Sequence, residues 1–137
     1  MPNNDQRARL GRWSDAHRSS YQRDEDVIDE RLPCFGWLRG LREMSPMLEL
    51  RKKTGSILAI GYCWIEQVEF DPSEGIFLDI EDRRIAIRGR NLNTELRPGV
   101  RLFEGLTRHR IPWIREASGP EVLTASDELC VVEVIEW

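Results

Sequence analysis

The sequence predicts an α+β fold, with a strongly twisted antiparallel sheet or small β-barrel, flanking short helices and a flexible N-terminal arm. Three observations lead to this prediction. Short apolar runs with a period of two follow one another between residues 46 and 92, and turn residues separate them. Beyond this region the apolar period becomes that of a helix. The first residues are polar and have no periodic apolar face.

The chain has 137 residues, which is enough for one modest hydrophobic core. We expect a polar arm over residues 1–32 and a single domain over 33–137, made of a β-meander core (46–92), a helix (93–110) and C-terminal strands (111–137). No apolar run approaches the roughly 20 residues that cross a bilayer. The first residues lack the apolar stretch of a secretory signal. These observations predict a cytoplasmic protein with no membrane partner.

The first element expected after the arm is a short helix over residues 33–44. Phe35, Leu38 and Leu41 lie three residues apart, which places them on one helical stripe. Pro46 is then expected to end the helix, because the residue before a proline disfavours helical geometry.

Short apolar stretches, most of which alternate with polar residues, predict a series of short strands near 48–51, 57–60, 67–70, 76–80 and 84–88. Turn residues lie between them at Thr54-Gly55-Ser56, Asp71-Pro72-Ser73-Glu74-Gly75 and Glu81-Asp82-Arg83. Close turns between strands of period two indicate an antiparallel meander.

The last third of the chain has less regular patterns. An apolar stripe over 100–106 predicts a short helix, and 112–116 reads as a strand or extended segment. Residues 118–120, Ser-Gly-Pro, predict a loop. Residues 130–137 are apolar at most positions, so we expect a final strand that is central or packed on both faces.

Catalytic motifs are missing from the sequence. It has no nucleophile elbow, no phosphate-binding glycine loop and no paired metal-ligand spacing, and His17 and His109 lie in different segments. Cys34, Cys63 and Cys130 are odd in number, far apart and set in apolar sequence, which favours buried reduced thiols over a disulfide framework. We therefore expect a non-catalytic protein without a cofactor or metal.

A block of positive charge is the main functional signal. Nine arginines and only two acids lie between Arg83 and Arg115, whereas the whole chain has a net charge of −4. Guanidinium groups suit bidentate contacts with phosphate. The residues predicted to bind nucleic acid are Arg84, Arg88, Arg90, Asn91, Arg101, Arg108, Arg110 and Trp113.

The placement of these residues favours single-stranded RNA or DNA. Arg84 and Arg88 share one face of a predicted strand, so their charges can follow one groove. Trp113 lies among the charges, and an aromatic ring there could stack on a base. The predicted function is accordingly a binding module for single-stranded nucleic acid.

A second hypothesis remains open, in which the arginines pair with the chain's own excess acid, notably residues 24–30. The chain would then be a protein-interaction or assembly subunit, with an acidic protein partner or as a homo-oligomer. Trp64 and Phe77 are expected to be exposed and would supply apolar contacts.

Two short motifs resemble those of the Sm and LSm proteins. Residues 70–78, FDPSEGIFL, are similar to the first Sm motif, and residues 87–92, IRGRNL, resemble the second. The resemblance covers roughly residues 35–92. It implies a small bent β-barrel that forms rings and binds RNA around a central pore. By position, Asp71 would orient the first loop, and Arg88 and Asn91 would contact base or phosphate.

The sequence departs from the Sm pattern where RNA would be bound. Gly75 stands where the family has a base-contacting asparagine. The spacer 72–74 has no aromatic residue or histidine to stack on a base, and Glu74 would repel phosphate. A barrel without these residues is expected to bind protein instead.

Overall fold

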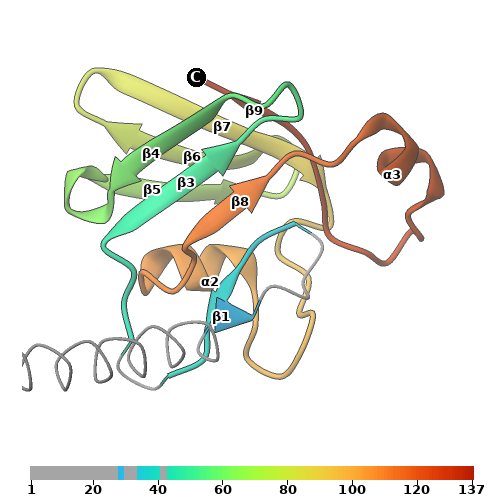
Figure 1. Cartoon of the computed structure of the whole chain (residues 1–137), viewed down its shortest axis with the longest axis horizontal. Coiled ribbons are helices and arrows are strands. Elements are labelled where there is room, and N and C mark those ends of the chain that lie inside the picture. The colour runs from blue at the N-terminus through green and yellow to red at the C-terminus, as the bar shows by residue number, and fades with distance from the viewer. Residues whose placement is uncertain (1–27, 30–33, 41–42) are drawn as a thin grey trace, which may run out of the picture.

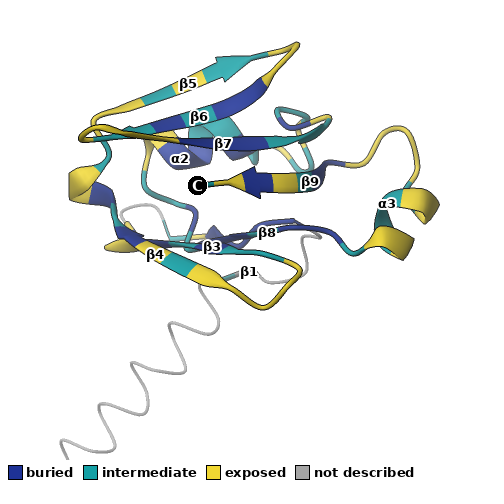
Figure 2. Cartoon of the chain, turned by 90° about the horizontal axis from the view of Figure 1, so that it is seen from above, coloured by how far each residue is buried: buried dark blue, intermediate teal, exposed yellow. Residues whose placement is uncertain are grey.

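The computed structural model describes residues 28–29, 34–40 and 43–137, and these build two facing β-sheets with a hydrophobic core between them (Figures 1 and 2). The first sheet has the order β4-β3-β8, with β3 at Met47–Arg51, β4 at Ile57–Gly61 and β8 at Trp113–Arg115. The second has the order β5-β6-β7-β9, with β5 at Gln67–Asp71, β6 at Gly75–Ile80, β7 at Arg83–Arg90 and β9 at Val131–Glu136. Strands β1 (Ile28–Asp29) and β2 (Trp37–Leu38) form a separate small ladder.

The first sheet combines a hairpin with a parallel strand. Strands β3 and β4 are antiparallel, and the turn between them contains Gly55 at a φ of 97°, a value that glycine adopts without strain. Strand β8 pairs with β3 in parallel, with Leu50 opposite Ile114. Both of these side chains are fully buried, so this sheet presents its inner face to the core.

The second sheet is antiparallel throughout. Ile76 lies opposite Ile87 and Leu78 opposite Ile85, and all four side chains are fully buried. Strand β9 pairs only with β7 among the described residues, across an irregularity next to Gly89. The alternation of buried and outward residues along β6 and β7 follows directly from the period of two in the sequence.

Within the described ranges, three short helices connect the strands. Helix α2 (Leu102–Thr107) buries Leu102 and Leu106, and Gly105 lets it approach Trp37 closely. Helix α3 (Gly119–Thr124) begins with a capping box but has no buried residue, and it projects from the sheets (Figure 1). The 3-10 helix η1 (Tyr62–Trp64) carries the chain from the first sheet to the second.

A buried carboxylate joins the two sheets. The side chain of Glu116 accepts hydrogen bonds from the backbone N–H of Lys53, at 2.9 Å, and of Ile135, at 2.6 Å. Lys53 follows β3 and Ile135 belongs to β9, so one side chain satisfies a donor from each sheet. Hydrogen bonds of this kind offset the cost of burying a charge.

The α+β class and the predicted strands are confirmed, but the described residues form no closed barrel. The meander is divided at η1, so its strands belong to two separate sheets. The predicted helix at 33–44 is wrong in its described part: Phe35 forms a bridge with Ile114, and residues 37–38 are strand β2. All residues from Cys34 to Leu38 are buried, which an extended segment between neighbours allows and a one-sided amphipathic helix does not.

Smaller differences concern the last third of the chain. The helix expected over 93–110 is confined to Leu102–Thr107, and the loop expected at 118–120 opens helix α3. The final strand, β9, lies at an edge of its sheet instead of the centre. The predicted arm, apart from Ile28 and Asp29 in β1, lies outside the described residues, and so does His17. No described helix has the length and apolar content needed to span a bilayer.

Candidate functional site

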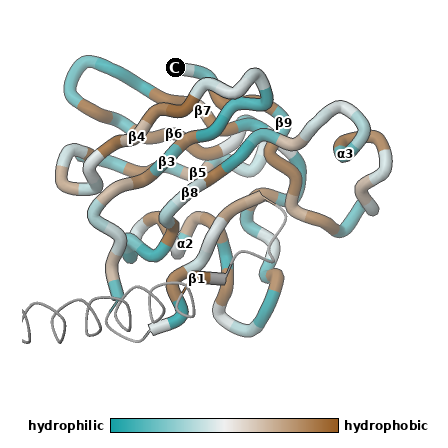
Figure 3. The backbone as a smooth tube through the Cα atoms, viewed as in Figure 1, coloured by the Kyte–Doolittle hydropathy of each residue, from teal (hydrophilic) through white to brown (hydrophobic). Residues whose placement is uncertain are grey.

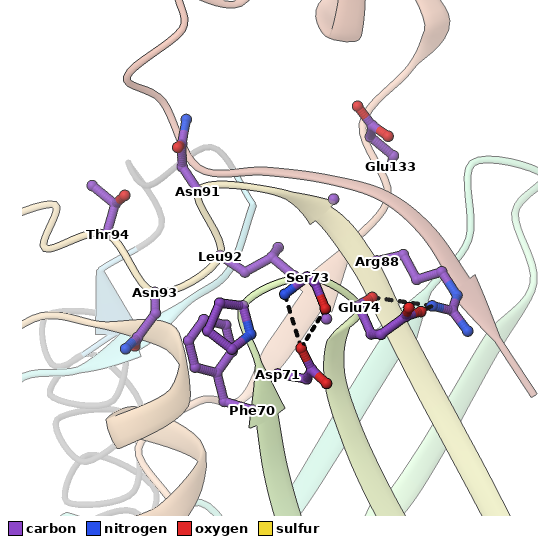
Figure 4. Close-up of a pocket in the computed structure, with 13 residues that line it drawn as sticks. Phe70, Asp71, Ser73, Glu74, Arg88, Asn91, Leu92, Asn93, Thr94 and Glu133 are labelled. Carbon is purple, nitrogen blue, oxygen red and sulfur yellow. Dashed lines mark hydrogen bonds and ion pairs between the residues drawn. The ribbon is translucent and has the colours of Figure 1, made fainter.

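The two Sm-like motifs meet at one cleft of about 490 Å³, which we call the motif cleft (Figure 4). One wall is the turn between β5 and β6, and the other is the end of β7 with the residues that follow it. The lining residues are Phe70, Asp71, Pro72, Ser73, Glu74, Gly75, Arg88, Gly89, Asn91, Leu92, Asn93, Thr94 and Glu133.

The first wall is a turn fixed by Asp71. Its carboxylate accepts hydrogen bonds from the hydroxyl of Ser73, at 2.7 Å, and from the backbone N–H of Ser73, at 2.9 Å, and these bonds lower the pKa of Asp71. Gly75 ends the turn at a φ of 132°, and a Cβ there would overlap the carbonyl oxygen of Ile87. The backbone therefore requires glycine at the position where Sm proteins have a base-contacting asparagine.

The second wall is built around Arg88. Its guanidinium contacts Glu136, at 2.9 Å, and Glu74, at 3.1 Å, and also donates to the carbonyl of Glu74. These contacts, first of all the one with Glu136, raise the pKa of Arg88. Because both carboxylates come from this chain, the charge that was predicted to meet phosphate is already paired.

The glycine and asparagine of the second motif also serve the fold. A Cβ on Gly89 would overlap the carbonyl oxygen of Val131, so glycine allows the backbone of β9 to approach β7 closely at this point. Asn91 adopts a left-handed φ of 54°, and its amide donates to the carbonyls of Asp127, at 2.5 Å, and Leu129, at 3.0 Å. The motif thereby holds the loop that leads into β9.

The charge of the motif cleft is mainly negative. Of the described residues that line it, three carry carboxylates, Asp71, Glu74 and Glu133, and one, Arg88, carries a positive charge. Phosphate groups would therefore meet repulsion from these acids.

Arg84 and Arg88 lie on the outer face of the second sheet, on either side of Phe77. Their guanidinium carbons are 4.3 and 5.6 Å from the centre of the Phe77 ring. Arg84 also pairs with Glu69 and, at 3.6 Å, with Asp79. Phe77 is therefore half-buried under charged groups that are themselves paired.

The other predicted residues are spread over the molecule. Arg90 contacts Glu133 at 3.2 Å, and Arg101 contacts Glu95 at 3.1 Å. Arg110 donates to the backbone carbonyls of residues 38 and 40.

Arg108 and Trp113 differ from each other in exposure. Arg108 is exposed at the end of α2. Trp113 is only 7% exposed and lies against Gly36, so its ring has no free face for a base. The eight predicted residues thus do not form one continuous surface.

A second surface lies at the free edge of the first sheet, and we call it the β4 edge patch: Met47, Ile57, Ala59 and Trp64. Trp64 is 60% exposed and Ile57 58%, and the Trp64 ring lies over Gly61. A shallow cleft of about 490 Å³ runs beside it, lined by Pro46, Met47, Ala59, Ile60, Gly61, Cys63, Trp64, Ile80 and Glu81. Strand β4 is apolar along most of its length (Figure 3), and in the described part of the chain nothing pairs with its outer edge.

Sequence reasoning singled out Trp64 but missed the rest of this patch. The available signal was the run Ile57-Leu58-Ala59-Ile60, which is apolar on both faces of the strand. Such a run is also typical of a central strand, and only the strand order shows that β4 lies at an edge.

Groups with catalytic potential are engaged in structural contacts. His109 stacks on Tyr62 with ring centres 4.5 Å apart. The hydroxyl of Tyr62 donates to the carbonyl of Ile111 at 2.6 Å, and burial raises the pKa of Tyr62. Over the described ranges, no three His, Cys, Asp or Glu side chains are grouped as metal ligands.

Comparisons with protein-family models, with curated proteins and with solved structures found no match for the chain. The resemblance to Sm proteins accordingly stays a prediction from the two motifs.

Proposed function

We propose that this chain is a non-catalytic protein-binding module that receives an extended segment of a partner protein along β4. The observation that carries the proposal is the β4 edge patch, in which exposed apolar side chains lie next to a strand edge that no other described strand pairs with. An open edge offers a row of backbone donors and acceptors to an added strand.

The chemistry of the patch defines the partner. An added strand would place alternate side chains over the outer face of β4, so apolar residues at every second position would cover Ile57 and Ala59. Trp64 and Met47 would serve as anchors, and burying one large side chain contributes roughly 1.5–3 kcal/mol. Glu81 lines the same cleft, which favours a basic residue at one end of the segment.

The experiment is selection of displayed random peptides on the purified protein. We expect peptides with alternating apolar residues that lose binding to Trp64→Ala and to Ala59→Lys. Arg88→Ala is the matched control, because it alters the opposite sheet, and it should bind the selected peptides as the unmodified protein does. Peptides that bind all three variants equally would contradict the proposal.

Light scattering of the purified protein tests whether a second copy occupies the patch.

Single-stranded nucleic acid at the motif cleft is a second candidate function. The observation that favours it is the meeting of both Sm-like motifs at one cleft, with Arg88 in its wall. Binding there should weaken steeply with salt, and Arg88→Ala should reduce it more than Lys53→Ala does. Fluorescence anisotropy with a mixed-sequence single-stranded RNA measures both effects. Equal affinities for the two variants would remove the motif cleft as the site.

A further inference from the structure

Two cysteines that are far apart in the sequence touch in the core. The sulfur of Cys34 lies 3.0 Å from that of Cys130, although 96 positions separate them along the chain. Both side chains are almost fully buried, at 2% and 1% exposure. Cys63, the third cysteine, is exposed and takes no part in this contact.

The contact bridges the two halves of the fold. The carbonyl of Cys34 accepts a hydrogen bond from the backbone N–H of Arg115 in β8, at 3.0 Å, so Cys34 is tied to the first sheet. Cys130 directly precedes β9, which belongs to the second sheet. A covalent bond between the two sulfurs would therefore join the two sheets near the start of β9.

We propose that Cys34 and Cys130 are a redox-active dithiol, which a low-molecular-weight disulfide converts to an intramolecular disulfide. The sulfurs need to approach by only about 1 Å to reach a bonded distance of roughly 2.05 Å. Rotations of two side chains can supply this, so the backbone elements on both sides keep their hydrogen bonds. The exposed Cys63 has no such neighbour.

A reagent would approach through a cleft of about 230 Å³ under helix α3. Both cysteines line it, together with Ala117, Glu121, Thr124, Ala125, Leu129 and Val131. Helix α3 buries none of its own residues, and two arginines of the sheets hold it: Arg115 donates to Glu121, at 2.9 and 3.2 Å, and Arg90 donates to the backbone carbonyl of Val122, at 2.7 Å. Such a lightly attached helix can open locally at low free-energy cost.

The chemistry is two successive thiol–disulfide exchanges. The thiolate of one cysteine attacks a sulfur of the reagent, forms a mixed disulfide and releases one reagent thiol. The thiolate of the second cysteine then attacks the protein sulfur of that mixed disulfide and releases the other reagent thiol. Two protein thiols are oxidised, one reagent disulfide is reduced, and the two protons end on the released thiols.

The environment of the pair keeps it reduced until α3 opens. Contact with Cys130, together with burial, raises the pKa of Cys34, so the closed site holds little of the reactive thiolate. The positive charge of Arg115 acts in the opposite direction. Opening the cleft to water removes the burial and increases the reactive fraction.

The test uses the full chain with Cys63→Ser, so that only the pair can react, and oxidised glutathione as the reagent. Intact mass should fall by two hydrogen atoms without a lasting glutathione adduct, and a non-reduced peptide map should link residues 34 and 130. Because the closed loop is long, the melting temperature should rise by about 10 °C. Adding Cys130→Ser should stop the reaction at a single adduct.

The outcome that would overturn the proposal is a folded protein that stays reduced under conditions that oxidise the urea-unfolded chain.

A second variant tests the route by which the reagent reaches the two cysteines. Glu121→Gln removes the ionic contact between α3 and Arg115 and should make disulfide formation several-fold faster with the same product. An unchanged rate would exclude the contact between Arg115 and Glu121 as the barrier.

Discussion

The side chains around the motif cleft have contacts within the folded chain, whereas those of the β4 edge patch are largely exposed to solvent. Around the motif cleft, Arg88 is paired with two carboxylates and Asn91 with two carbonyls of the same chain. At the β4 edge patch, Trp64 and Ile57 are more than half exposed, and β4 has no described neighbour on its outer side. The residues that look most like a binding motif thus hold the fold together, whereas the residues with unmet contacts lie outside any motif.

This difference separates two kinds of mutational effect. Changes around the motif cleft remove contacts that exist within the folded chain, so they should lower the free energy of unfolding. Changes in the β4 edge patch remove little from the folded chain, so they should alter association and leave stability almost unchanged.

The largest loss of stability is expected for Gly75→Ala. A Cβ there overlaps the carbonyl of Ile87, and the φ of 132° disfavours any other residue. We expect a loss of about 3 kcal/mol in the free energy of unfolding, measured by urea titration. Gly99→Ala is the control, because its φ of 77° is also positive but no atom lies within 4 Å of its Cβ position. An equal loss in both variants would show that the overlap has no effect beyond backbone strain.

A smaller loss is expected for Asn91→Ala. The substitution removes two hydrogen bonds to the loop before β9 and places alanine in left-handed geometry. We expect about 1–2 kcal/mol by the same urea titration. Asn91→Gly keeps the geometry and loses only the bonds, so it should lose less. If Asn91→Gly is as stable as the unmodified protein, the amide contacts contribute nothing.

Acid should loosen helix α3 before it unfolds the sheets. Hydrogen bonds from Arg115, and then from the N–H of Ser118, lower the pKa of Glu121 from 4.5 to about 2. Because the pKa of the folded state is depressed, this contribution is complete above about pH 4.5 and is lost as the pH falls toward 2. Amide chemical shifts of α3, followed by NMR, should report the change. In Arg115→Gln the midpoint should move upward, and an unmoved midpoint would contradict the assignment to this pair.

The smallest effect on stability is expected for Ala59→Lys. Ala59 is exposed on the outer face of β4, so a lysine there can extend into water. The free energy of unfolding should change by no more than about 0.5 kcal/mol. A charge on an edge strand opposes the addition of a further strand, so peptide binding should be lost while stability is kept. A large loss of stability would show that Ala59 is packed in a way that its exposure does not indicate.

Local patterns predicted the strands, and non-local pairing determined the rest of the fold. Alternation over 76–80 and 84–88 is a property of neighbouring residues, and β6 and β7 lie where it predicts. The parallel pairing of β8 with β3 joins segments that are distant in the sequence, and no local pattern specifies it. Helix α3 had a readable local signal in the capping box of Ser118 and Glu121.

The arginine block shows why the candidate site could not be read from composition. The sequence shows nine arginines beside two acids, but most of the acids that pair with them lie outside the block, on other strands, in a turn or on helix α3. Glu69 reaches Arg84 from β5, and Glu136 reaches Arg88 from β9. Strand order and register determine these two pairs, and a count of charges along the sequence gives no information about either.

The parallel pairing of β3 with β8 also has a consequence for the order of folding. The hairpin of β3 with β4 and the run from β5 to β7 have short connections, so each can form soon after its residues meet. The pair of β3 with β8 can form only after the whole intervening segment, including α2, has been drawn together, and this closure costs entropy before any contact repays it. We therefore expect the first sheet to be completed late, with β8 docking onto a hairpin that is already in place.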